Sequence, residues 1–181
     1  IMNYHSKAFE QSVGVREGYV FGCEHRFFSD YAKLLAGVLA DANWTNVLKL
    51  SKMILEAHKS GGRIFLCGNG GSAADSMHLS AELIGRFKRN RIPLKSISLS
   101  SNPSTITCIS NDFGYEKWVE KAINFYGDKG DVVILISSSG KSQNMINGAK
   151  EARKKGIKKI ITFTGNQKNN NLKKLGNINF W

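Results

Sequence analysis

The sequence predicts an α/β fold: a three-layer sandwich around a parallel sheet of about five strands, preceded by an N-terminal helical hairpin. The apolar run 63–67 lies between glycines and the run 131–136 is continuous and β-branched, as buried parallel strands are. Helical patterns alternate with such runs, which implies right-handed crossovers and helices on both faces of the sheet. Two amphipathic stretches before the first strand give the hairpin.

The chain divides into three predicted parts. Residues 1–23 show no clear period and form an N-terminal extension. Residues 24–60 hold the hairpin, with one helix over 24–41 and a second that ends before Gly61-Gly62. Residues 61–181 form the sheet domain. Two amphipathic helices cannot both bury their apolar stripes on a small sheet, so we expect part of that surface to meet another subunit.

Within the sheet domain, strands and helices alternate. The expected strands are short and mostly apolar: 63–67, 95–99, 131–136, 157–164 and 177–180. The expected helices are 73–85, a brief one that opens at Pro103, 115–125 and 143–155. Residues 111–114 have the composition of a turn. Loops that follow parallel strands meet at the carboxyl edge of the sheet, where such folds bind ligands.

One such loop is the glycine turn, Gly68 to Ser72, which leads into the helix over 73–85. Its glycines tolerate positive φ and leave backbone N–H groups bare, and a helix N-terminus attracts anions. We interpret it as a phosphate cradle that holds sugar hydroxyls or shares a phosphate. The residues expected to contact the ligand are Asn69, Gly70, Gly71 and Ser72.

Nucleotide motifs do not fit the chain. The spacing Gly68-x-Gly70-x-x-Ala73 is a weak dinucleotide fingerprint, but the second strand ends without the acidic residue that would hold the ribose of NAD. A Walker A motif ending at Lys141-Ser142 would need glycine at position 135, which is leucine. The remaining interpretation is a phosphate monoester on a small molecule, with no nucleotide cofactor.

The serine loop, residues 137–142, is a second cradle before a helix. Its four serine hydroxyls surround a glycine at a helix N-terminus, so that hydroxyl and N–H donors can converge on one anion. The competing interpretation is a group of helix-capping serines, but four around one glycine after a buried strand favour a phosphate site. The predicted phosphate ligands are Ser137, Ser138, Ser139 and Ser142.

His78 and Glu82 lie four residues apart on the helix that the glycine turn opens, and therefore on one helix face. An imidazole and a carboxylate at this spacing can share a metal ion or act together on one substrate. The competing interpretation is a solvated pair on the helix surface.

Composition bounds the class of protein. The net charge of +12 comes from lysine-rich clusters without interleaved aromatic residues, which favours a basic solvated surface that steers anions over nucleic-acid binding. No apolar run reaches the roughly 20 residues of a membrane helix, and residues 1–20 lack the apolar core of a secretory signal. Three widely spaced cysteines, Cys23, Cys67 and Cys108, fit reduced thiols. We therefore expect a cytoplasmic protein.

Three motifs in order carry a resemblance to one family. The stretch CGNGGSAADSMHLSAELIGR resembles the signature of the phosphoheptose isomerases, a branch of the sugar isomerase (SIS) domain family. Residues 110–114 and 137–142 resemble the other two landmarks of that family, and the resemblance covers about residues 27–181. It implies an SIS phosphosugar-binding fold over 61–181, a homotetramer with sites between subunits, and isomerisation of sedoheptulose 7-phosphate to D-glycero-D-manno-heptose 7-phosphate for lipopolysaccharide or capsule.

The resemblance also implies roles for residues. It gives the phosphate to the serine loop and a substrate contact to Asp112, whose other interpretation is an Asx cap. Glu82 suits the catalytic base and His78 an electrophile or metal ligand, while some relatives use both as zinc ligands. Lys141 departs from the asparagine that relatives more often have.

Two implications stay open in the sequence. In the family, a helix after the fifth strand supplies a glutamine and a histidine to the site, and no residue here matches them, so this C-terminal helix is expected to be missing. The alternative function is a non-catalytic SIS module that senses phosphosugars or resembles replication-initiator-binding homologues. Those homologues keep the histidine and lose the glutamate, so the presence of Glu82 favours the enzyme.

Overall fold

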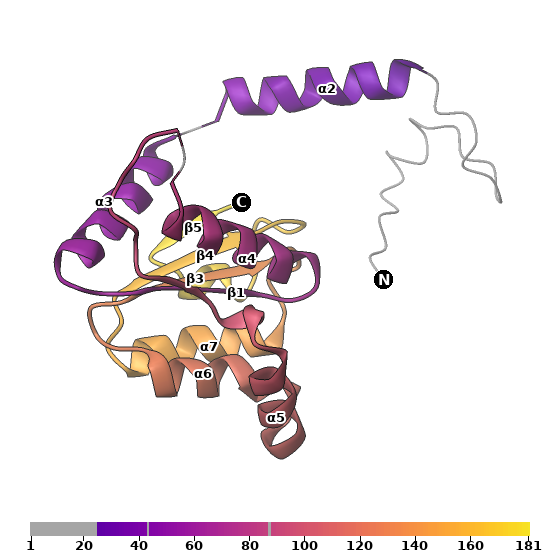
Figure 1. The fold of residues 1–181 in the computed structure, drawn as a ribbon. Coiled ribbons are helices and arrows are strands. Elements are labelled where there is room, and N and C mark those ends of the chain that lie inside the picture. The colour runs from indigo at the N-terminus through magenta and orange to yellow at the C-terminus, as the bar shows by residue number, and fades with distance from the viewer. Residues whose placement is uncertain (1–24, 43, 87) are drawn as a thin grey trace, which may run out of the picture. The chain divides into compact units, whose positions relative to one another are not determined.

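The computed structural model describes residues 25–42, 44–86 and 88–181 (Figure 1). Its internal contacts divide the chain into two units, Ile1–Trp44 and Thr45–Trp181. In the first unit, helix α2 spans His25–Ala40 and confirms the first helix of the predicted hairpin. The rings of Phe27 and Tyr31 stack along it with centroids 6.3 Å apart. The predicted extension over 1–23 lies outside the described residues.

The second unit is built on a five-stranded sheet in the order β2-β1-β3-β4-β5. All strand pairs are parallel, as the alternation of strands and helices predicted. The strands are β1 Ile64–Gly68, β2 Ser96–Ser98, β3 Val132–Ser137, β4 Lys159–Thr164 and β5 Ile178–Phe180. In the register of the sheet, Gly68 at the end of β1 lies beside Ile136 of β3. The glycine turn and the serine loop therefore leave adjacent strands at the same edge.

Helices cover both faces of this sheet, which confirms the three-layer sandwich (Figure 1). Helices α3 and α4 pack on one face and α6 and α7 on the other, with α5 beside α6. The helices are α3 Thr45–Lys59, α4 Gly71–Ile84, α5 Pro103–Phe113, α6 Trp118–Tyr126 and α7 Gln143–Lys154. Short 3₁₀ turns complete the chain: η1 Leu99–Ser101, η2 Tyr115–Lys117 and η3 Lys173–Leu175. Among the described residues, no helix is long and apolar enough to cross a membrane.

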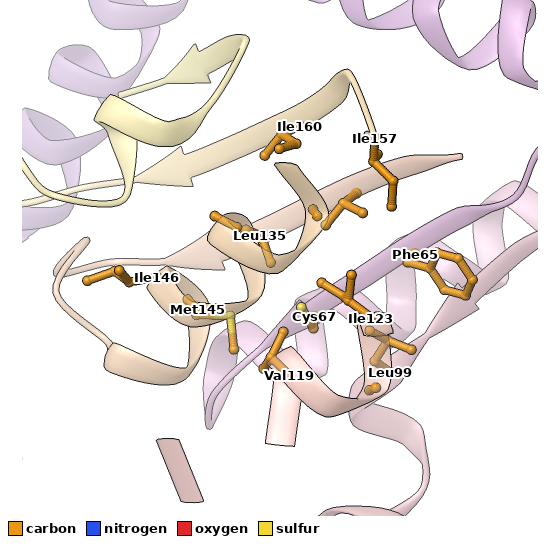
Figure 2. Packing of buried hydrophobic residues seen from close by; sticks show 14 of the residues in the cluster. Phe65, Cys67, Leu99, Val119, Ile123, Leu135, Met145, Ile146, Ile157 and Ile160 are labelled. Atoms are coloured by element: carbon orange, nitrogen blue, oxygen red, sulfur yellow. The ribbon is translucent and has the colours of Figure 1, made fainter. Parts of the chain in front are cut away.

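The strands bury alternate side chains in two cores. Phe65 and Cys67 of β1 point into the core shared with α6 and α7, where Val119, Ile123 and Met145 meet them (Figure 2). Their neighbours Ile64 and Leu66 face the second core, which Ala57 and Met53 of α3 help to close. A strand that is buried on both faces reads as a continuous apolar run, which is why β1 and β3 could be found from the sequence.

The structure corrects the predicted turn over 111–114. The helix that opens at Pro103 is not brief, because α5 runs for eleven residues and includes Asn111, Asp112 and Phe113. The Asn102 side chain caps its start by accepting a hydrogen bond from Thr105 N at 3.1 Å. Gly114, at φ +92°, ends it. Asparagine and aspartate in the last turn of a helix look like turn residues, and only the glycine marks the actual end.

Candidate functional site

The glycine turn is a tight reversal between β1 and α4. The N–H of Ser72 donates to the carbonyl of Asn69 at 3.0 Å, and Gly70 adopts φ 55° and ψ −122°. These angles are those of the first central residue of a type II′ turn, where glycine is strongly preferred. No side chain caps the start of α4. The N–H groups of Ser72 and Ala73 donate to the carbonyls of Asn69 and Gly70, which leaves those of Gly70 and Gly71 to meet an anion placed at the turn.

Gly68 lets the turn fold back on its own strand. A Cβ atom at this position would lie 2.4 Å from the carbonyl oxygen of Ser72, so a larger residue would push the turn away from β1. The hydroxyl of Ser100, which follows β2, accepts from the N–H of Gly68 at 3.2 Å and donates to its carbonyl at 3.0 Å. The cradle is therefore held by backbone geometry and by one neighbouring serine.

The serine loop also turns on a glycine. Gly140 lies in the left-handed region at φ +62°, and its N–H donates to Ser137 O at 3.0 Å. Ser142 occupies the N-cap position of α7, but its side chain does not cap the helix and instead lies 3.1 Å from the hydroxyl of Ser137. The helix-capping interpretation of these serines therefore fails for Ser142. The N–H groups of Gln143 and Asn144 keep their capacity to bind an anion, while that of Met145 donates to Asn144 Oδ1.

Contacts from the loop that follows β4, the strand beside β3, brace the serine loop. A Cβ atom on Gly140 would lie 2.2 Å from Asn170 Cγ, so the Asn170 side chain packs directly against the glycine. The N–H of Leu172 donates to Gly140 O at 3.0 Å, and the N–H of Gly165 to Ser138 O at 2.9 Å. Asn170 is buried and its own amide bonds Thr164, Gln167 and Lys173. The sequence showed only a polar asparagine turn here.

The two loops are joined by a pair of amide side chains. Asn69 Nδ2 donates to Asn144 Oδ1 at 3.0 Å, and Asn144 Nδ2 donates back to Asn69 Oδ1 at 2.8 Å. The hydroxyl of Tyr115 also donates to Asn69 Oδ1, at 2.9 Å. The structure thus brings the predicted glycine-turn and serine-loop residues together at one edge of the sheet. Asn144 and Tyr115 were missed, because a lone asparagine in a helix and a tyrosine after a glycine carry no chemical signature.

Asp112 lies in the last exposed turn of α5, three residues before Tyr115. Its Oδ1 accepts from Asn111 Nδ2 at 3.1 Å, and Cys108 Sγ lies 3.8 Å from its Oδ2. Its carboxylate caps no helix start, so the Asx-cap interpretation does not describe it. Tyr115, and not Asp112, makes the contact between this segment and the glycine turn.

His78 and Glu82 are side by side on the outer face of α4. Their Nε2 and Oε1 atoms are 3.5 Å apart, and their side chains are 78% and 47% exposed. The opposite face of α4 carries Ser76 and Ser80, whose hydroxyls bond Ser98 at 2.8 Å and Ser96 at 3.1 Å on β2. This buried serine contact fixes the rotation of α4 and turns the pair away from the sheet. Proton transfer at so open a pair needs a second surface to exclude water.

The described residues do not by themselves form a zinc site. A zinc site needs three or four protein ligands, and no group of three or more histidine, cysteine, aspartate or glutamate side chains forms one within the described ranges. His78 and Glu82 supply two nitrogen and oxygen donors of the right type, which by themselves do not make a site.

Cys67 stands one residue before the end of β1 and is fully buried. Burial raises the pKa of its thiol far above the ordinary value of 9.0. The thiol is therefore a small core side chain and not a nucleophile for the adjacent cradle. Cys108 is an exposed free thiol, and Cys23 lies outside the described residues.

The raised pKa of Cys67 predicts a loss of stability in alkali. Above pH 9.0 the unfolded chain releases the thiol proton that the folded chain retains. The free energy of unfolding should then fall by about 1.4 kcal/mol per pH unit from this group. Urea unfolding at pH 8 to 11 measures this decrease. In Cys67→Ala, the free energy of unfolding should fall less steeply with pH, by about 1.4 kcal/mol per pH unit. Equal slopes would contradict a buried neutral thiol.

Comparison with known proteins identifies the family of this chain. A family model described as the SIS domain matches residues 26–165, which include the glycine turn, α5 and the serine loop. The chain belongs to the SIS domain family. The resemblance inferred from the three motifs is confirmed by this match, and so is the α/β architecture expected from it.

Among the proteins with similar sequences are several phosphoheptose isomerases. The chain is 47% identical over 112 residues to that of Aliarcobacter butzleri (strain RM4018), covering 62% of this chain and 59% of the relative. It is 43% identical over 125 residues to that of Proteus mirabilis (strain HI4320), covering 69% and 64%. The chain thus spans about three fifths of the length of these curated relatives. A solved phosphoheptose isomerase structure from Francisella tularensis matches 85% of this chain and 81% of its own at 26% identity, with a TM-score of 0.77.

Proposed function

We propose that this protein is a ketose–aldose isomerase that converts sedoheptulose 7-phosphate to D-glycero-D-manno-heptose 7-phosphate. The observation that carries the proposal is the joining of two anion cradles at one sheet edge by the Asn69–Asn144 pair. A single anion would need one cradle, whereas a sugar phosphate has a charged end and a polyhydroxyl end. The similarity to phosphoheptose isomerases supports the choice of sugar. The product would serve heptose synthesis for lipopolysaccharide or capsule, and the cytoplasmic location expected from the sequence fits a soluble metabolite.

The serine loop would bind the phosphate. Ser142 does not cap α7, so the helix N-terminus can donate to phosphate oxygens. The hydroxyls of Ser138, Ser139 and Ser142 would donate from the loop, and that of Ser137, which is buried, would act through its contact with Ser142. Hydrogen bonds to a charged group are stronger than those between neutral groups, and the helix dipole adds to them. Lys141 is exposed at the same loop and would add positive charge near the ligand.

The glycine turn would hold the sugar end. Its bare N–H groups at Gly70 and Gly71 and the half-buried hydroxyl of Ser72 are donors of the kind that sugar oxygens accept. Asn69 contributes less than the sequence suggested, because its carbonyl oxygen already accepts two hydrogen bonds. Asp112, exposed at the end of α5, would accept from a sugar hydroxyl.

Glu82 would move the proton. The ketose has its carbonyl at C2, so the base removes a proton from C1 to give an enediolate and returns a proton to C2, leaving the carbonyl at C1. His78, at 3.5 Å from Glu82, would donate a hydrogen bond to the oxygen that gains charge in this step. Zinc binding by this pair stays a sequence-based prediction that depends on ligands from outside the described residues.

The proposal makes the protein a homo-oligomer, a tetramer by family resemblance, with sites between subunits. Apolar side chains lie exposed beside the His78–Glu82 pair on α4, namely Met77, Leu79 and Ile84. Burial of this face by another subunit would exclude water from the pair. Sedimentation velocity at micromolar concentrations should therefore show a species of several times 20.0 kDa. A monomer at every concentration would contradict this arrangement.

Serine substitutions test the phosphate assignment. Ser139→Ala or Ser142→Ala should weaken binding of sedoheptulose 7-phosphate by about 1–3 kcal/mol, the loss of a hydrogen bond to a charged group. Isothermal titration calorimetry on the protein from its complete gene measures this, with Ser51→Ala, an exposed serine of α3, as the control. Unchanged affinity in both variants would move the phosphate away from the serine loop.

The exposure of His78 and Glu82 favours one second candidate, a phosphosugar-binding module without turnover. Such a module would bind the sugar phosphate through the same two cradles. It would differ from the enzyme in leaving every carbon-bound proton of the ligand in place.

A further inference from the structure

The side chains between the two cradles form a closed hydrogen-bonding unit, which we call the clamp: Asn69, Asn144 and Tyr115. Asn144 is 2% exposed, so its amide must find partners within the protein. Its Oδ1 accepts from Met145 N at 3.1 Å, and this contact fixes which of the two amide positions the oxygen takes and which the nitrogen takes. The orientation of the pair is therefore set by the backbone of α7.

The clamp uses most of the hydrogen-bonding capacity of Asn69. Asn69 Oδ1 accepts from Asn144 and from the hydroxyl of Tyr115, and one of its two amide hydrogens goes to Asn144. Asn69 immediately precedes Gly70, whose angles require the turn to hold a narrow conformation. A residue immobilised at this point limits where the turn can place its N–H groups.

Each member of the clamp comes from a different part of the chain. Asn69 follows β1, Tyr115 begins η2, and Asn144 lies in the first turn of α7 directly after the serine loop. Helix α7 is also tied to the η2 segment by Asn147, whose Nδ2 donates to Glu116 O at 2.9 Å. The clamp thus connects the glycine turn to the two other segments that lead to the site.

We propose that Asn144 and Tyr115 are positioning residues that act through Asn69 and fix the spacing between the glycine turn and the serine loop. This inference rests on the proposed function in one respect, that a single sugar phosphate spans both cradles. A ligand that spans both needs them at one separation, whereas inorganic phosphate fills only the serine loop. Loss of the clamp should therefore discriminate between the two ligands.

The test compares the two ligands in a double-mutant cycle. In Asn144→Ala, the dissociation constant of sedoheptulose 7-phosphate should rise about tenfold, while that of inorganic phosphate changes less than about twofold. Asn69→Ala should give a similar rise. The double variant should bind sedoheptulose 7-phosphate about as weakly as either single variant, because both substitutions remove the same contact. Lys150→Gln, at an exposed position of the same helix and outside the clamp, is the control and should leave both constants unchanged.

If Asn144→Ala damages only the serine loop, it weakens the binding of both ligands equally. If Asn144 and Asn69 act independently, the rise in the dissociation constant of the double variant is the product of the two single rises. Either result overturns the proposal. Should Asn144→Ala not fold, the cycle is run with Tyr115→Phe and Asn69→Ala, since the Tyr115 hydroxyl reaches the turn only through Asn69. Tyr115→Phe should raise the dissociation constant of sedoheptulose 7-phosphate about threefold in the parent and should have no effect in the Asn69→Ala variant. If the two substitutions weaken binding additively in free energy, the clamp is overturned. If the parent protein binds inorganic phosphate but not sedoheptulose 7-phosphate, the proposed function fails, and the clamp is judged with fructose 6-phosphate.

Discussion

Glu82→Gln is expected to lower the turnover of sedoheptulose 7-phosphate by about two to four orders of magnitude, the usual effect of removing a general base. Glutamine keeps the size of the side chain and can still bond His78, which lies 3.5 Å from the carboxylate. Binding of the substrate should therefore change little, and the loss should appear in kcat and not in KM. An NMR assay of product formation, with calorimetry for the affinity, separates the two.

The control for this variant is Glu56→Gln, which removes the same charge from an exposed position on α3. Its turnover should equal that of the parent. A chelator titration of the parent distinguishes the two roles that the sequence left open for Glu82, because activity lost to the chelator and restored by zinc would make the pair metal ligands. Parental turnover in Glu82→Gln would make Glu82 a residue of the helix surface.

Gly140→Ala is expected to damage the serine loop most severely. Alanine at φ +62° costs about 1–2 kcal/mol, and its Cβ would lie 2.2 Å from Asn170 Cγ, so the buried Asn170 must move. Because Asn170 cannot withdraw without losing its own hydrogen bonds, we expect a destabilisation of about 2–4 kcal/mol in total. Affinity for inorganic phosphate should fall about tenfold or more. Urea unfolding and calorimetry measure the two effects.

Gly130→Ala is the matched control, since a Cβ at Gly130 would meet no atom within 4 Å and the residue has no positive φ. It should change the free energy of unfolding by less than about 0.5 kcal/mol and leave phosphate affinity unchanged. If Gly140→Ala behaves as this control does, the bracing of the serine loop by Asn170 is wrong.

The sheet and its order of elements could be predicted because parallel strands that are buried on both faces leave an unambiguous pattern. Val132 to Leu135 are all buried, and glycines bound β1 on both sides. The helices followed from the apolar period between these runs. The end of α5 was missed because Asn111 and Asp112 favour turns locally, while the helix continues until the positive φ of Gly114 stops it.

The two cradles could be predicted because glycine and serine clusters at helix starts have a direct physical meaning. The residues that hold them could not, because their roles depend on distant partners. Asn144 is 75 positions from Asn69, and Asn170 packs on Gly140 through a contact that only the folded β4 region creates. Hydrogen bonds between amide side chains have no spacing rule in the sequence, unlike the four-residue spacing that identified His78 and Glu82.

The central claim is that the joined cradles hold a ketose phosphate while a base removes a carbon-bound proton from it. The most direct measurement is proton NMR of sedoheptulose 7-phosphate in deuterated water with the purified protein from its complete gene. The isomerase predicts that the C1 proton signal decays as deuterium enters from solvent, and that signals of the heptose 7-phosphate aldose appear. Binding by calorimetry with every C1 proton retained, and no aldose formed, would contradict the enzyme and leave a phosphosugar-binding module.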